Sequence, residues 1–257
     1  MVSKSVAAGV ETIVSAVALI GLRIAPTLAY APPFTLLRVP LTVRLALSLG
    51  LATILVLSNP QATSDKLIGG NAGIEMVVRE MLLGATLAIS LQLAFGALLT
   101  AGRVIDIQAG FGLALLADPN LKSQMPLIGT LFAYAAGAIF FMTTGPADLV
   151  AIWSNSISLI PIGTFGGLSD IGALGSYITA CFSIAMGLAG LVLFVLFMLD
   201  LGVAFLSKTL PQMNVLLLSF QVKTFALLLT LPLTFVMSGA LFLRLVRMAI
   251  DATGAIK

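Results

Sequence analysis

Six long apolar runs constrain this chain more than any other feature. They cover about residues 9–31, 41–58, 76–101, 127–143, 173–206 and 215–243. About 20 apolar residues are enough to cross a bilayer as a helix, so we predict an all-α membrane protein. The composition agrees, because 60% of the residues are hydrophobic and only 9% are charged, whereas a soluble domain is about one quarter charged.

Two of these runs are longer than a bilayer requires. As helices, residues 173–206 and 215–243 would be roughly 50 and 44 Å long, against a hydrocarbon core about 30 Å thick. Such helices must tilt, break (Pro232 is a candidate position) or leave the bilayer, and apolar surface outside lipid needs protein to cover it. The sequence therefore predicts a subunit of a complex.

Charged residues, glycines and prolines in and between the runs predict the remaining elements. Arg23 and Pro26 are expected to break the first run. Residues 102–126 carry Gly, Asp and Pro and are typical of neither a span nor an ordinary loop. A further short helix is expected from Thr144-Gly145-Pro146 until Pro161 closes it.

Several classes of site are not supported by the residues. The chain has no histidine, which removes the commonest general base and metal ligand. Its single cysteine, Cys181, cannot form an internal disulfide. There is no phosphate loop, and the 13 basic residues form no tract that would bind nucleic acid. We predict no catalytic, cofactor-binding or metal-binding residue.

One pair of charges stands inside apolar runs, where charges are costly and usually paired. If the last two runs form an antiparallel hairpin, its turn lies between Pro211 and Gln212, and Asp200 and Lys223 are equally far from that turn. They then lie level on facing helices. We interpret them as a structural ion pair; a proton or ion relay would need further acidic residues or histidines along the same path.

The stretch QAGFGLALLADPN suggests a special loop. Gly110 and Gly112 flank Phe111, and Asp118-Pro119 favours a turn. Irregular backbone at membrane depth is tolerated only inside protein or against a water-filled cavity. The stretch is therefore either a re-entrant, pore-lining element or a plain surface loop. Just before it, Arg103 and Asp106 share a helical face, which favours local neutralisation.

Four stretches carry a resemblance to a known family. They are RIAPTLAYAPPFTLLRVPLTVRLALSL (23–49), AGRVIDIQAGFGLALLADP (101–119), TTGPADLVAIWSNSISLIPIG (143–163) and LPQMNVLLLSFQVK (210–223). Together and in this order the chain resembles the FliR family, the export-gate subunits of the flagellar type III secretion apparatus. It departs from the family pattern at Arg103, where an acid is common, at Pro146, where His is frequent, and at Gln221, where Pro is usual.

The resemblance implies a fold and a function. It implies one unit over residues 1–257, built of long helical hairpins, with a FliP-like part at 1–172 and a FliQ-like hairpin at 173–257. Such a protein is a non-enzymatic core subunit that forms, with FliP and FliQ homologues, the pore for unfolded flagellar substrates. It would contact membrane lipid and an FlhB homologue at the cytoplasmic entrance. Its place would be the bacterial inner membrane, within the flagellar basal body and raised toward the periplasm.

The resemblance also implies roles for two groups of residues. A re-entrant glycine-rich loop at about 106–122 would act as a pore plug, with Gln108, Gly110, Phe111, Gly112, Asp118 and Pro119. The tip of the last hairpin would face a partner through Pro211, Gln212, Met213 and Asn214.

Other functions stay open at this point. The virulence type III counterpart of the family shares the four stretches. A secondary transporter of a small solute would need polar groups converging at mid-membrane and related halves of the chain. A membrane enzyme would need a catalytic constellation, and the residues offer none.

Overall fold

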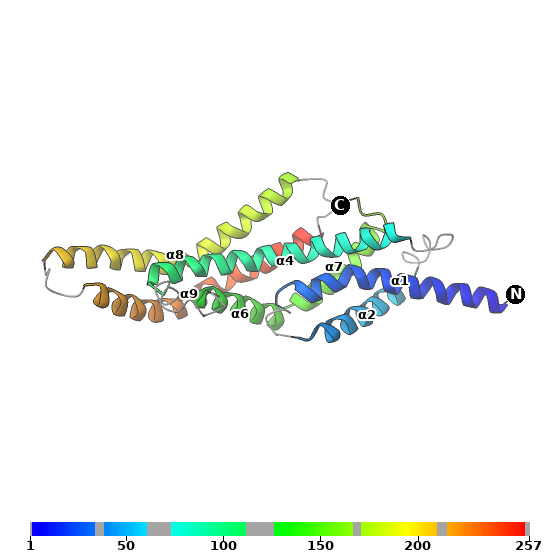
Figure 1. Cartoon of the computed structure of the whole chain (residues 1–257), viewed down its shortest axis with the longest axis horizontal. Coiled ribbons are helices and arrows are strands. Elements are labelled where there is room, and N and C mark those ends of the chain that lie inside the picture. Colours follow the sequence, from blue (N-terminus) through cyan, green and yellow to red (C-terminus); the bar gives the residue numbers. More distant parts are fainter. Residues whose placement is uncertain are drawn as a thin grey trace. The chain divides into compact units, whose positions relative to one another are not determined.

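Every element that the structure describes is an α-helix (Figure 1). The structure, a computed structural model of the chain, describes residues 2–33, 39–60, 73–111, 126–166, 171–209 and 215–254. The helices are α1 (Val2–Tyr30), α2 (Leu41–Ser58), α4 (Ile74–Ala109), α6 (Leu127–Met142), α7 (Gly145–Leu159), α8 (Ile171–Thr209) and α9 (Val215–Gly254). The predicted all-α class is confirmed.

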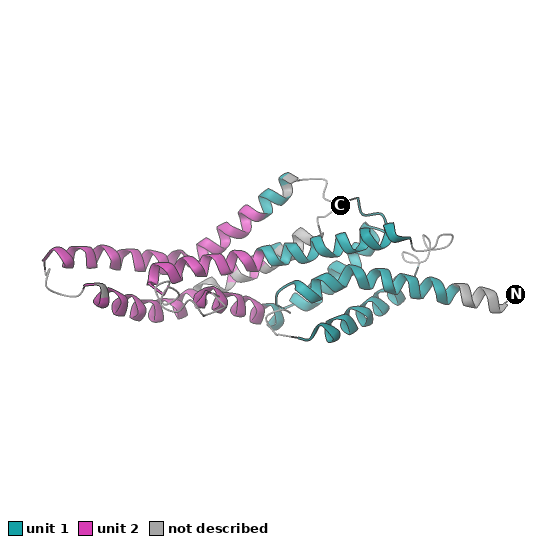
Figure 2. Cartoon of the chain, in the orientation of Figure 1, with its two compact units in different colours: residues 1–93, 140–177, 246–257 teal, residues 94–139, 178–245 magenta. Residues whose placement is uncertain are grey.

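The chain divides into two compact units (Figure 2). Unit 1 comprises residues 1–93, 140–177 and 246–257, and unit 2 comprises residues 94–139 and 178–245. Each unit therefore takes residues from both sides of the predicted boundary between 172 and 173. That boundary, between a FliP-like part and a FliQ-like hairpin, stays a prediction.

Five of the described helices are long and apolar enough to cross a membrane. The candidate spans are Gly9–Tyr30, Leu41–Ser58, Ile74–Ala109, Leu174–Thr209 and Leu217–Val236. The run predicted at 127–143 forms α6, which has only 16 residues and reaches spanning length only together with α7, with a bend of 74° between the two helices. The described residues thus contain five candidate spans, or six if the bent pair is one span, as expected of an integral membrane protein.

The two last helices are even longer than predicted. α8 has 39 residues and α9 has 40, which corresponds to about 58 and 60 Å at 1.5 Å per residue. Pro232 lies inside α9 and does not end it. Both helices therefore exceed a hydrocarbon core of about 30 Å by a wide margin.

Two predicted interruptions are wrong. α1 continues through Arg23 and Pro26. α4 passes through Gly102 and ends only at Ala109, so the first third of the stretch predicted to be irregular is helical. A proline or a charge inside a membrane helix is tolerated where neighbouring helices supply the missing partners, and the contacts below identify the partners of Arg23.

The core of unit 1 lies between α1, α2, α7 and the first part of α4. α2 folds back beside α1 (Figure 1), and a Cβ on Gly21 of α1 would lie 3.0 Å from Leu49 Cδ2 of α2. Apolar side chains of α1 and α4 fill the interior, among them Leu19, Ile20, Ile24, Leu83, Leu87 and Leu91, each at most 2% exposed.

The core of unit 2 lies between the last part of α4, most of α6 and the α8–α9 hairpin. Its buried side chains include Phe95, Ile105, Phe132, Leu188, Leu196 and Leu227. The rings of Phe132 on α6 and Phe235 on α9 meet edge to face, with centroids 5.6 Å apart. This unit contains the described residues that the sequence singles out as functional.

Candidate functional site

Only part of the set of residues predicted to be functional is described. The described residues include Gln108, Gly110 and Phe111 of the predicted plug loop, together with Asp200 and Lys223. The remaining residues, Gly112, Asp118 and Pro119 of the loop and Pro211, Gln212, Met213 and Asn214 of the hairpin tip, lie outside the described part of the chain.

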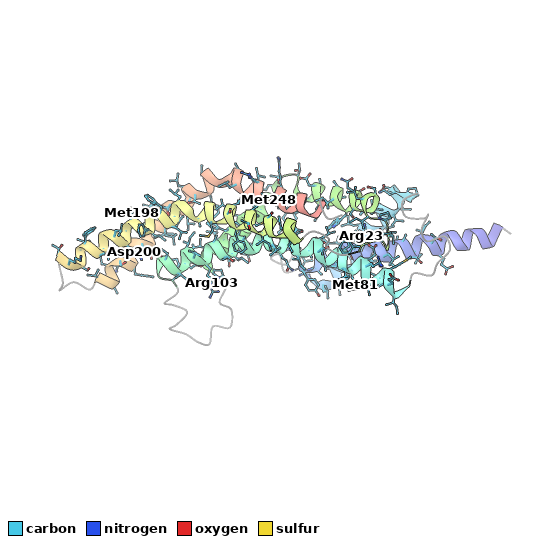
Figure 3. All side chains as sticks on the ribbon, turned by 90° about the horizontal axis from the view of Figure 1, so that it is seen from above. Arg23, Met81, Arg103, Met198, Asp200 and Met248 are labelled. Carbon is cyan, nitrogen blue, oxygen red and sulfur yellow. The ribbon has the colours of Figure 1, made fainter. Side chains whose placement is uncertain are left out.

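The two charges on the last hairpin are in direct contact. Lys223 Nζ on α9 lies 2.5 Å from Asp200 Oδ1 on α8, where Figure 3 labels the aspartate. Their side chains are 13% and 35% exposed. The pair is thus only partly enclosed by this chain, and its role as a structural element remains a proposal.

Gln108 at the end of α4 joins this pair and closes a ring of three residues. Its amide Nε2 donates to Asp200 Oδ2 at 2.7 Å. In return, Lys223 Nζ donates to the main-chain oxygen of Gln108 at 3.0 Å. Carbonyls in the last turn of a helix have no partner within the helix, and a cation there is favourable. We call Gln108, Asp200 and Lys223 the clamp.

The backbone after the clamp ends α4 by a defined motif. The Phe111 N–H donates to the Asp106 carbonyl at 2.9 Å, and the Gly110 N–H donates to the Ile107 carbonyl at 3.1 Å. These are the two bonds of a Schellman motif, which requires a left-handed residue at the position of Gly110. Gly110 has φ +91°, so the irregular stretch begins here and not at residue 102.

The first residues beyond α4 rest on α9. The rings of Phe111 and Phe220 meet edge to face, with centroids 6.0 Å apart. A Cβ on Gly110 would lie 3.3 Å from Phe220 Cδ2. Phe220 is one turn before Lys223, so the apolar contact and the clamp hold the same segment on the same helix.

The end of α4 also makes an unusually close crossing with α6. A Cβ on Gly102 would lie 2.1 Å from the backbone of Gly129. This position of α4 therefore has room only for the hydrogen of a glycine. Asp106 accepts from the Ile128 N–H near the start of α6, at 3.2 and 3.3 Å to its two oxygens. Asp106 thus caps a second helix, a role beyond the predicted neutralisation of Arg103.

Sequence reasoning missed a fully buried ion pair and its polar neighbours, which lie in unit 1. Arg23 Nε and Nη2 donate to the two carboxylate oxygens of Glu80 at 2.7 and 3.0 Å, and both side chains are 0% exposed. Arg23 also donates to Ser156 Oγ at 3.1 Å and to the Ile160 carbonyl at 3.0 Å. The Gly163 N–H donates to Glu80 at 2.8 Å. We call this set the arginine cluster; Figure 3 labels Arg23 on α1.

Two glycines bring the backbone close to the arginine cluster. A Cβ on Gly84, one turn after Glu80 on α4, would lie 2.5 Å from the Arg23 carbonyl oxygen. Gly163 has φ +75°, and a Cβ there would lie 2.8 Å from Met76 Cγ. The cluster therefore joins α1, α4 and the end of α7 at a point where these segments touch.

One sequence signal could have found the arginine cluster. Glu80 stands inside the apolar run at 76–101, just as Arg23 stands inside the first run. Each charge in an apolar run predicts a partner of opposite sign. Asp200 and Lys223 lie on helices that follow each other closely in the sequence, since α8 ends at Thr209 and α9 begins at Val215. Nothing local aligns Arg23 with a residue 57 positions away.

Both clusters are suited to holding helices together. Each contains one carboxylate paired with one cation, and their remaining bonds go to amide, hydroxyl or main-chain groups. Within the described residues, no three His, Cys, Asp or Glu side chains gather in a way that could hold a metal ion.

Comparison with known proteins identifies the relatives of this chain. A family described as bacterial export proteins, family 1, matches residues 14–249. The flagellar biosynthetic protein FliR of Escherichia coli (strain K12) is 25% identical over 206 residues, which cover 77% of this chain and 76% of that protein.

Two further relatives are a second flagellar biosynthetic protein and a translocation protein. The flagellar biosynthetic protein FliR of Bacillus subtilis (strain 168) is 29% identical over 58% of this chain and 59% of its own length. The Yop proteins translocation protein T of Yersinia pestis is 28% identical over 58% of each chain. The alignments with these two proteins cover less than two thirds of their lengths.

Proposed function

Because the chain belongs to the family of bacterial export proteins, family 1, we propose that it is a core subunit of a type III protein-export apparatus. The observation that carries this proposal is the family match over residues 14–249, nearly the whole chain. In this role the protein has no catalytic, cofactor or metal residue of its own. It lies in the bacterial inner membrane, within the flagellar basal body and raised toward the periplasm.

The surface of the hairpin supports a role inside an assembly. In the most apolar parts of the spans Leu174–Thr209 and Leu217–Val236, only 28% and 17% of the residues are buried, against 56% in Ile74–Ala109. Large apolar side chains remain exposed along both helices, including Phe194, Phe197, Phe205, Phe225, Leu228 and Leu229. Helices of about 58 and 60 Å carry more apolar surface than a bilayer can cover without strong tilt.

The proposed partners are FliP and FliQ homologues, with which the chain forms the pore for unfolded substrates, and an FlhB homologue at the cytoplasmic entrance. In this assembly residues 1–172 form the FliP-like part and residues 173–257 the FliQ-like hairpin. The tip from Pro211 to Asn214 faces a partner. Purification of the tagged chain in mild detergent should recover FliP and FliQ homologues at fixed ratios. A stable, solitary monomer would contradict the proposal.

The stretch at about 106–122 is proposed to act as the plug of the pore. The support is its composition together with the contacts that place Gln108, Gly110 and Phe111 against α8 and α9. Deletion of residues 110–116 should raise ion conductance through membranes while the complex still assembles. An unchanged closed state in an assembled complex would refute the plug.

The flagellar assignment competes with a virulence assignment. The relatives from Yersinia pestis and Shigella flexneri, a translocation protein T and a surface presentation of antigens protein SpaR, are 28% and 24% identical to this chain, close to the 25% of the Escherichia coli FliR. We favour the flagellar system, since several FliR proteins match. Removal of the gene should abolish motility; intact motility with loss of effector secretion would reverse the assignment.

A further inference from the structure

We propose that Gln108 is a positioning residue, and that the clamp uses the ion pair of the hairpin to fix the point where the chain leaves α4. The pair does more than join α8 to α9. Asp200 divides its two carboxylate oxygens between Lys223 and the Gln108 amide. Lys223 divides its donors between Asp200 and the Gln108 carbonyl. Within the clamp, Gln108 contacts both charges through different atoms.

The position of Gln108 makes this attachment specific. It stands two residues before Gly110, whose positive φ turns the chain out of the helix. The Schellman motif uses the carbonyls of Asp106 and Ile107 as acceptors. The Gln108 carbonyl takes no part in the motif and is free to accept a bond from Lys223. Lys223 therefore completes the end of α4 from another helix, a role for which a cation is favoured by the helix dipole.

The consequence is the placement of Phe111. The clamp holds the helix end level with Lys223, and Phe111 then meets Phe220 one turn along α9. Asp106 meanwhile faces α6 and binds its first turn. Because Asp106 and Gln108 are two positions apart, they point to nearly opposite sides of α4, so the last turn of α4 is held from both sides.

The clamp is built for reversible contact. Asp200 is about a third exposed, and solvent access weakens an ion pair relative to a fully buried one. A movement of α8 against α9 would stretch the pair and release the Gln108 amide and carbonyl together. If the chain has the proposed export function, this geometry couples the hairpin to the first residues of the plug.

The test uses cross-linking between residues 111 and 220 in membranes that contain the whole complex. Phe111→Cys and Phe220→Cys are introduced together with Cys181→Ala, and the rate of cross-linking by a short bifunctional thiol reagent is measured. Gln108→Leu, which keeps the size of the side chain but has no amide, should slow cross-linking at least about threefold. Asp200→Asn should have a similar effect.

A matched control is available on the same helix. Gln92 also donates through Nε2 to a carbonyl, that of Tyr30 at 3.0 Å, but it lies in unit 1. Gln92→Leu should leave the cross-linking rate unchanged. Lys223→Met should slow cross-linking. Lys223→Arg, which keeps the charge and the donors, should cross-link at nearly the original rate.

Each result decides the inference. An unchanged rate in Gln108→Leu would overturn it, and so would an equal loss in the Gln92→Leu control. If Gln108→Leu reduces the level of the protein, the cross-linking rates of Lys223→Arg and Lys223→Met are compared instead. Equal rates in these two variants would overturn the inference. A slower rate without any change in ion leak or export supports the positioning role and counts against the plug, so the two failures are distinguishable.

Discussion

The arginine cluster and the clamp are both ion pairs in an apolar chain, yet they differ in burial. Arg23 and Glu80 are 0% exposed, whereas Lys223 and Asp200 are 13% and 35% exposed. In the first cluster Glu80 accepts three hydrogen bonds and Arg23 donates four. In the second, each carboxylate oxygen accepts one.

This difference separates a fixed joint from a releasable one. A buried pair that loses one partner leaves an uncompensated charge, which costs about 3–5 kcal/mol. Breaking a pair that is accessible to solvent costs much less stability, since exposed pairs contribute about 0–1 kcal/mol. We infer that the arginine cluster fixes the fold of unit 1, while the clamp in unit 2 holds a segment that can be released.

The largest effect is expected when the buried pair is broken. Arg23→Met leaves the Glu80 carboxylate buried without a cation, and should destabilise the protein by about 3–5 kcal/mol. Thermal unfolding of the detergent-purified chain measures this. The double variant Arg23→Met/Glu80→Met should recover part of the loss, because two apolar side chains leave no unpaired charge. A single variant as stable as the wild type would refute the fixed joint.

A steric change at the end of α4 should be next in size. Gly102→Ala forces a methyl group to within 2.1 Å of the Gly129 backbone, where no side chain can move away, and overpacking of this kind costs about 1–3 kcal/mol or more. Gly96→Ala on the same helix is the control, because a Cβ there meets nothing within 4 Å. The control should be neutral or stabilise by about 0.5–1 kcal/mol. Equal effects of the two changes would contradict the close crossing.

A smaller effect is expected from the clamp. A double-mutant cycle of Asp200→Asn and Lys223→Met should give a coupling of about 1 kcal/mol after the exposure of Asp200 is taken into account. Each single change should weaken assembly, and the second change should partly relieve the first. The measurement is the thermal stability of the assembled complex. A coupling indistinguishable from zero would show that the two charges do not act as a pair.

The smallest effect belongs to the exposed pair on α4. Arg79 Nη2 lies 2.7 Å from Glu75 Oε1, with side chains 36% and 76% exposed. Glu75→Gln should cost no more than about 0.5 kcal/mol, as for other pairs four residues apart on a helix. Arg79 keeps its bond to the Phe165 carbonyl at 3.2 Å. If Glu75→Gln destabilised the protein as much as Arg23→Met does, burial would not explain the difference between the arginine cluster and the clamp.

Sequence patterns predict the features that depend on local chain geometry. The lengths of the apolar runs indicate the helical class and the excess length of α8 and α9. A short turn fixes the register of a hairpin, so the equal sequence distances of Asp200 and Lys223 from that turn are enough to place the two residues level with each other. Their contact in the structure agrees with this register.

The features that sequence patterns do not predict depend on helices that meet from distant parts of the chain. Arg23 and Gly102 look like interruptions as long as their partners, Glu80 and Gly129, are unknown. The positive φ of Gly110 marks the point where the chain leaves α4. The bonds that tie Gln108 to Asp200 and Lys223 need the relative position of three helices, which no local pattern contains.

A parallel measurement on two matched variants tests the comparison most directly. Glu80→Gln and Asp200→Asn each replace one carboxylate oxygen by an amide nitrogen at constant size. In Glu80→Gln the new donor must face Arg23 or the Gly163 N–H, which are donors themselves. In Asp200→Asn the new donor faces the Gln108 amide, but the partly exposed side chain can turn it away from Gln108 while its oxygen still faces Lys223. Thermal unfolding of the full chain in detergent should show a clearly larger loss of stability for Glu80→Gln. An equal loss, or a larger one for Asp200→Asn, would contradict the assignment of a fixed and a releasable joint.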